Sequence, residues 1–190
     1  MRWLGLYARS RQMPASAGVV VLVALAVCAL NQDGPGPVDL GMAVLVLTVN
    51  VAAASVGLGG RDVVLERTAA IRWVPRRAAH VLLIGAFAGA VLLAVQATGA
   101  KLAPTEVVLR DSAGLAGLAG LGAVLCGAQL AWTLPTGWLA IALLVPAPQG
   151  RVGEVIDWMI FPPGTAASSG TAWTLLATGT VAYALAGPRR

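Results

Sequence analysis

Residues 112–131 decide the class of fold, and they read SAGLAGLAGLGAVLCGAQLA. They carry no charge and belong to a run of 39 uncharged residues between Asp111 and Arg151. A helix of about 20 apolar residues crosses the roughly 30 Å of hydrocarbon in a bilayer. The stretch therefore predicts a membrane-spanning helix.

The composition of the whole chain agrees with this interpretation. The 190 residues are 58% hydrophobic and 11% charged, and the mean hydropathy is +0.81. A soluble domain carries about 25% charged residues, so these charges are too few to cover a soluble surface. The composition excludes a soluble single domain, a disordered chain and a fibrous repeat.

The other spans are predicted from the remaining charge-free gaps, because a charge at the centre of a span costs about 2.5–3.5 kcal/mol. Four gaps fit one span each, and they lie between residues 11 and 33, 39 and 61, 77 and 101, and 157 and 189. The gap after Asp111 fits two spans, separated by a turn signal at Thr133-Leu134-Pro135-Thr136-Gly137.

We therefore predict an all-α polytopic membrane protein, a six-transmembrane-helix bundle that forms one domain over residues 1–190. The expected spans lie near residues 13–31, 38–58, 79–99, 112–131, 136–149 and 166–186. The fifth is short enough to be tilted or re-entrant. The first resembles a secretory signal too, because Arg2, Arg9 and Arg11 precede an apolar run, but a span is the favoured interpretation.

Six spans place both termini on one side, and ten of the thirteen Lys and Arg residues share that side. These ten are Arg2, Arg9, Arg11, Arg61, Arg67, Arg72, Arg76, Arg77, Arg189 and Arg190. The positive-inside rule makes this side cytoplasmic, which predicts a multi-pass protein of the cell membrane with both termini in the cytoplasm. Anionic lipid headgroups are the expected partner of the basic face, and nucleic acid is not.

Catalytic patterns are missing from the sequence. There is no Walker A pattern, GxSxG, HExxH or CxxC pair, and His80 has no evident nucleophile or metal partner. We therefore expect no catalytic residue, no metal and no cofactor in this chain. An intramembrane enzyme ranks last among the alternatives, because Asp33 and Asp39 are its only candidate pair of carboxylates.

Small residues within the predicted spans indicate close helix packing. Ala113/Gly117 and Ala116/Gly120 are small-xxx-small pairs. A GxxxG pair, Gly85/Gly89, lies in the third span. We predict that Gly85, Gly89, Gly117 and Gly120 serve helix packing inside the chain, and a dimer contact is the alternative.

Three amides also fall within predicted spans, namely Asn50, Gln96 and Gln129. They predict interhelical hydrogen bonds or, alternatively, a polar translocation path. No predicted span interior contains Asp, Glu, Lys or Arg. This argues against a proton- or ion-coupled pump and favours an external source of energy.

Two segments outside the spans have structure of their own in this prediction. The cytoplasmic loop 59–78 contains a short helix that Asp62 can cap, with an apolar stripe formed by Val64, Leu65, Thr68 and Ile71. The extracellular segment 149–165, which contains Trp158 and Phe161, is predicted to form an amphipathic or partly re-entrant helix with an aromatic anchor at the membrane interface.

The layout resembles a known family, the small integral-membrane subunits of bacterial ATP-binding-cassette (ABC) exporters of the type-2 permease class. The likeness depends on six spans with inner termini, the second-to-third loop, the external segment 152–163 and the ending Tyr-Ala-Leu-Ala-Gly-Pro-Arg at 183–189. The Leu-Glu-Arg-Thr-Ala core at 65–69 looks typical of actinobacterial members. The compact size and short fifth span depart from the family and favour dimerisation.

This resemblance implies a permease subunit driven by a separate ATPase subunit, which would bind ATP and Mg. It implies that coupling to the ATPase involves Asp62, Leu65, Glu66, Arg67 and Thr68. A second permease copy, or a sister permease, would complete the path. The alternative is an accessory membrane protein, an immunity or assembly factor, that binds another membrane protein.

Overall fold

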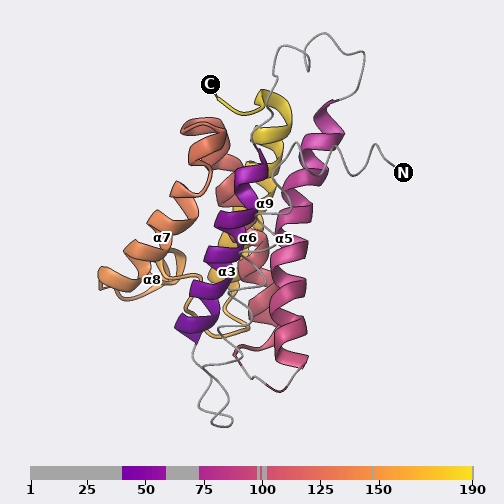
Figure 1. The fold of residues 1–190 in the computed structure, drawn as a ribbon. Coiled ribbons are helices and arrows are strands. Elements are labelled where there is room, and N and C mark those ends of the chain that lie inside the picture. Colours follow the sequence, from indigo (N-terminus) through magenta and orange to yellow (C-terminus); the bar gives the residue numbers. More distant parts are fainter. Residues whose placement is uncertain (1–39, 59–72, 98, 100–101, 147, 190) are drawn as a thin grey trace.

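The computed structural model describes residues 40–58, 73–97, 99, 102–146 and 148–189. These residues form helices joined by turns, and none of them lies in a β-strand. In chain order the elements are α3 (Leu40–Ser55), η1 (Val56–Leu58), α5 (Trp73–Ala97), α6 (Thr105–Leu125), η2 (Ala128–Leu130), α7 (Thr133–Leu144), α8 (Arg151–Ile156) and α9 (Ala166–Ala186). Helices α3, α6 and α9 run in one direction, and α5 and α7 run in the other (Figure 1). The prediction of an all-helical chain is thus confirmed for the described residues.

The predicted spans agree with the helices to different degrees. The sixth coincides with α9, and the second coincides with α3 and η1 from Leu40 onward. Helix α5 begins at Trp73, six residues before the predicted start, so residues 73–78 of the predicted loop are helical. Helix α6 begins at Thr105 and ends at Leu125, instead of covering 112–131. The first predicted span lies outside the described residues.

The region predicted as the fifth span, 136–149, differs most. Helix α7 covers Thr133–Leu144 and has 12 residues, which is too short to cross the hydrocarbon alone. The turn predicted at 133–137 is wrong, because those residues form the first part of α7. The chain breaks instead at Gly127, which has a φ of 100°, a backbone conformation that glycine tolerates and other residues rarely adopt.

Three helical segments are long and apolar enough to cross a membrane: Leu40–Leu58, Trp73–Ala97 and Thr105–Leu125. Large apolar side chains are exposed on these helices, among them Leu82, Leu83 and Phe87 on α5. In water such a surface would be costly, whereas in lipid it is the expected one. Helix α9 has 21 residues and no charge, but six serine and threonine residues make it less apolar.

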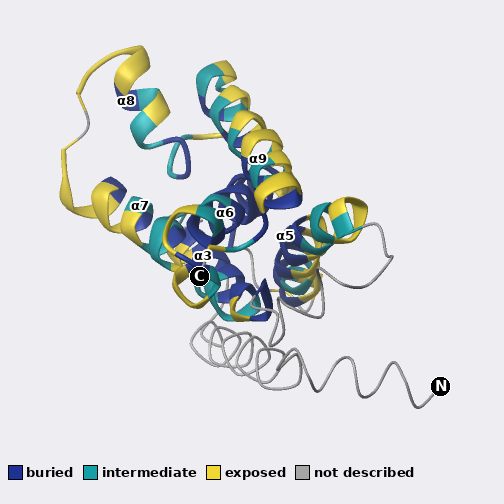
Figure 2. Ribbon diagram, turned by 90° about the horizontal axis from the view of Figure 1, so that it is seen from above, coloured by how far each residue is buried: buried dark blue, intermediate teal, exposed yellow. Residues whose placement is uncertain are grey.

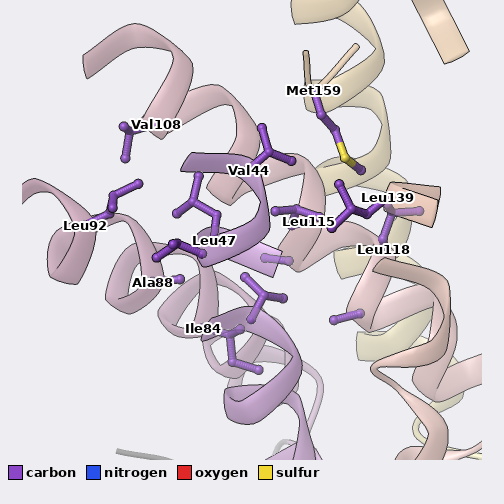
Figure 3. Packing of buried hydrophobic residues seen from close by; sticks show 14 of the residues in the cluster. Val44, Leu47, Ile84, Ala88, Leu92, Val108, Leu115, Leu118, Leu139 and Met159 are labelled. Carbon is purple, nitrogen blue, oxygen red and sulfur yellow. The ribbon is translucent and has the colours of Figure 1, made fainter. Parts of the chain in front are cut away.

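Helix α6 is the centre of the bundle. It packs against α3, α5, α7 and α9, and its contact with α9 is the most extensive of these. Seen from above, its buried ribbon lies among the other helices (Figure 2). Side chains from α3, such as Leu47, meet Ala88 of α5 and Leu115 of α6 in the core (Figure 3). Alanine and glycine let α6 take this position, because their small side chains allow neighbouring backbones to approach.

Candidate functional sites at the two ends of the bundle

Charged side chains lie at the two ends of the described bundle, and the two ends differ in the signs of charge that they carry. One end, here the basic end, holds the first turns of α5 and the last turns of α6 and α9. Its described charged residues are Arg76, Arg77 and Arg189. The opposite end carries both signs, in Glu106, Arg110, Asp111, Arg151, Glu154 and Asp157. The two ends therefore offer different surfaces to a partner.

The five residues predicted to couple to an ATPase, Asp62, Leu65, Glu66, Arg67 and Thr68, lie outside the described residues. The described chain resumes after four further residues, at Trp73, where α5 begins. The Arg76 guanidinium lies 5.9 Å from the centroid of the Trp73 ring, within range of a cation–π interaction. The first turn of α5 thus presents a basic and aromatic surface. It directly follows, in sequence, residues 59–72, which contain the predicted coupling residues and are called the coupling segment below.

The C-terminal segment, residues 183–189, joins several helix ends at the basic end. The Tyr183 hydroxyl donates to the Leu58 carbonyl oxygen at 2.8 Å, and this bond is buried. The Arg189 backbone N–H donates to the Ala123 oxygen at 3.0 Å, and Arg189 Nη1 donates to the Leu125 oxygen at 3.4 Å. These carbonyls belong to the last turns of helices, where no N–H of the same helix is available.

At the opposite end, an arginine and an aspartate are buried inside α6. Arg110 is 4% exposed and Asp111 is 0% exposed, and Arg110 Nε donates to Asp111 Oδ1 at 2.8 Å. The expectation that no span interior contains Asp, Glu, Lys or Arg depends on a span at 112–131. The structure places Arg110 and Asp111 inside a helix that begins at Thr105, six residues before Asp111. Pro104 and Glu106 were the overlooked signals of that helix start.

The Arg110 guanidinium also holds a turn that is distant in sequence. Its Nη2 donates to the Met159 oxygen at 3.3 Å and to the Phe161 oxygen at 3.0 Å. Its Nη1 donates to the Pro162 oxygen at 3.4 Å. Three hydrogen bonds from one side chain therefore connect α6 to the turn 159–162, and the fourth, to Asp111, stays within α6. Charge-assisted bonds of this kind are stronger than neutral ones, so the turn is firmly positioned.

Further contacts fix the segment around this turn. Trp158 is fully buried, and its ring lies where a Cβ on Gly114 would stand. Trp138 Nε1 donates to the Ile156 oxygen at 2.8 Å. Ser168 Oγ donates to the Glu154 oxygen at 3.2 Å. Trp158 therefore does not supply the aromatic interface anchor predicted for this segment, because its ring packs inside the protein on the glycine face of α6.

Polar atoms near this turn are buried without a hydrogen-bond partner in the described chain. They are Asp111 Oδ2, Asp157 Oδ1 and Trp158 Nε1. Burial raises the pKa of the Asp157 carboxyl above its ordinary value, because the ionised form loses hydration. Within the described residues no group of three His, Cys, Asp or Glu side chains could hold a metal ion.

The three amides predicted for interhelical bonds or a polar path are not brought together. Asn50 is fully buried in α3, and neither its Oδ1 nor its Nδ2 has a hydrogen-bond partner among the residues that the structure describes. Gln96 lies near the end of α5, where its Oε1 accepts from the Ala103 N–H at 3.2 Å. Gln129 is exposed in η2, beyond the other end of α6. Of the three, Asn50 alone lies in the bundle interior without a partner.

The four glycines predicted for helix packing lie at contacts within the chain. A Cβ on Gly85 would stand 3.0 Å from Ala116 Cβ, and one on Gly89 would stand 3.0 Å from Ser112 Oγ. A Cβ on Gly117 would overlap the backbone of Leu175. One on Gly120 would stand 2.9 Å from the Gly179 oxygen. These glycines therefore let α6 approach α5 on one side and α9 on the other.

Comparison with known proteins gives no independent assignment. No protein family, no curated protein and no solved structure matches this chain. A function can therefore be inferred only from the residues of the chain itself.

Proposed function

We propose that the chain is the transmembrane permease subunit of an ATP-driven ABC exporter. In this proposal it forms six spans in the cell membrane, with both termini in the cytoplasm. A separate ATPase subunit, which binds ATP and Mg, docks on the basic end. A second permease copy or a sister permease completes the translocation path.

The observation that carries the proposal is the continuity of α5. Its 25 residues extend about 37 Å at 1.5 Å per residue, which exceeds the roughly 30 Å of hydrocarbon. The helix is therefore long enough for its first turns, which contain Arg76 and Arg77, to extend beyond the hydrocarbon. A helix that runs unbroken from the predicted coupling segment into the membrane would carry a displacement of that segment to the span.

An accessory membrane protein is the second candidate, and α7 favours it. This helix is too short to cross alone, and Ile141, Leu143 and Leu144 are exposed on it. Such a face could pack against another membrane protein as well as against lipid. The two candidates differ in the protein that accompanies the chain.

Purification of the tagged protein from native membranes in mild detergent tests the proposal. We expect an ATP-hydrolysing subunit to accompany it, and Glu66→Arg to remove that subunit by reversing a charge of the predicted coupling segment. The matched control is Glu106→Arg, the same reversal at an exposed residue of the opposite end, and it should leave the subunit bound.

The alternatives give different results. A membrane protein without ATPase activity in place of the ATPase would support the accessory candidate and overturn the proposal. An ATPase that remains bound and coupled to transport in the Glu66→Arg variant would show that these coupling residues are wrongly assigned.

A further inference from the structure

Described residues on both sides of positions 59–72, which contain the predicted coupling residues, contact α9 or the glycine that follows it. Leu58, the last described residue before that segment, is 1% exposed, and its carbonyl accepts from the Tyr183 hydroxyl. Tyr183 is 3% exposed and belongs to the last turn of α9. A carbonyl at a buried helix end costs free energy when it lacks a donor, so this bond fixes the end of α3 and η1 to α9.

The other flank of the segment meets α9 through glycine. Gly187 has a φ of 70°, and a Cβ at this position would stand 2.7 Å from Arg77 Nη1. The Arg77 guanidinium, in the first turns of α5, therefore packs directly on the Gly187 backbone. Arg189 bonds to Ala123 and Leu125 of α6. The segment 183–189 thus touches the ends of α3, α5 and α6.

Helix α9 is in turn bound tightly to α6. A Cβ on Gly179 would overlap the Gly117 backbone, so the two backbones are in contact along the helix axes. At the far end α6 holds the turn 159–162 through Arg110. The last turn of α9 is thus connected through direct contacts to α6 and, through Arg110, to the turn at the opposite end.

We propose that Tyr183 is a positioning residue: its bond to Leu58 holds the end of α3 and η1, directly before the coupling segment, against α9 and so against α6. Gly187 provides the corresponding contact with Arg77 at the start of α5. The consequence for transport depends on the proposed permease function. There, movement imposed by the ATPase on the coupling segment passes through Tyr183 to α6 and α9. The structural join itself does not depend on that function.

Spin labels at exposed positions test the join in the full chain, with both cysteines replaced by serine. Val56 and Leu185 report on α3 against α9, and Val74 and Leu185 report on α5 against α9; all three are exposed. Tyr183→Phe removes the hydroxyl but keeps the ring. We expect the ratio of displaced to docked conformers for the 56–185 pair to rise about fivefold, the factor for roughly 1 kcal/mol, one hydrogen bond.

Two comparisons make the result specific. Thr178→Val removes a hydroxyl from the exposed side of the same helix, where Thr178 bonds only within α9, and should leave both distances unchanged. Gly187→Ala should displace Arg77 and broaden the 74–185 distance. If the distribution of distances between labels 56 and 185 is the same in Tyr183→Phe as in Thr178→Val, the proposal is overturned.

The role of Tyr183 in transport is tested in a separate experiment. With an ATPase subunit bound, Tyr183→Phe should lower transport per ATP hydrolysed while the subunit remains attached, and an unchanged ratio would contradict the positioning role. If no ATPase accompanies the chain, the permease proposal fails, and the label distances still decide whether Tyr183 positions α3.

Discussion

At the scale of single residues, the buried Arg110–Asp111 pair has the largest energetic consequence. Two charges removed from water cost more than their mutual attraction returns unless further bonds satisfy them. Arg110 gains such bonds from the Met159, Phe161 and Pro162 carbonyls. Asp111 accepts a hydrogen bond through Oδ1, whereas its Oδ2 has no partner within the described part of the chain. Loss of Arg110 would therefore leave the buried Asp111 carboxylate without its charged partner.

We predict that Arg110→Met lowers the free energy of unfolding by about 3–5 kcal/mol, because it leaves a buried carboxylate unpaired. The double variant Arg110→Met/Asp111→Leu should recover part of this loss, because no unpaired charge remains, although the three carbonyls stay unsatisfied. Thermal unfolding in detergent, followed by tryptophan fluorescence, measures both. A double variant no more stable than Arg110→Met would contradict this account.

Glycine contacts give a second prediction at this scale. Gly179→Ala should destabilise by about 1–3 kcal/mol or more, because its Cβ would overlap the Gly117 backbone of α6. Gly170→Ala in the same helix meets nothing within 4 Å. It should be neutral or stabilising by about 0.5–1 kcal/mol, since alanine favours the helix. Melting temperatures of the two variants in one detergent check the difference, and equal values would exclude the close α6–α9 approach.

At the scale of elements, the connection between α6 and α7 shows how position changes the meaning of a residue. Pro135 and Gly137 together indicate a turn in the sequence, yet both lie within α7. Pro135 is the third residue of that helix, in the first turn, where its missing N–H breaks no intrahelical bond. Gly127 makes the actual break with its positive φ.

We predict opposite effects from two glycine substitutions in this connection. Gly127→Ala should cost about 1–3 kcal/mol, because its φ of 100° and ψ of 157° are suited to glycine only. Gly137→Ala lies in a helix with open space around its Cβ and should be neutral or slightly stabilising. Thermal unfolding of the pair gives the test. A larger loss for Gly137→Ala would mean that the break is where the sequence indicated it.

At the scale of the whole molecule, the predicted orientation in the membrane depends on the distribution of charge. The described charges of the basic end are three arginines, whereas the opposite end has both signs. An excess of Lys and Arg marks the cytoplasmic side. Because α5 and α6 run in opposite directions (Figure 1), the start of α5 and the end of α6 share a side.

We therefore predict that cysteines at Val74 and Val152, both exposed, react from opposite sides of the membrane. In intact cells of a cysteine-free variant, a membrane-impermeant maleimide should label position 152. It should label position 74 only after permeabilisation. External labelling anywhere in 61–77 would invert the topology and remove the basis for an ATPase at the basic end.

The sequence alone determined the membrane class and the bounds of α9, because length, charge and hydropathy act locally along the chain. It also indicated which glycines permit close packing. Tertiary structure decided which helix each glycine meets, and that Arg110 lies inside α6 with partners 49 to 52 residues away. A buried charge becomes tolerable only through such distant donors and acceptors. A sequence rule that excludes charges from spans therefore places the start of α6 too late, and only the packed structure corrects it.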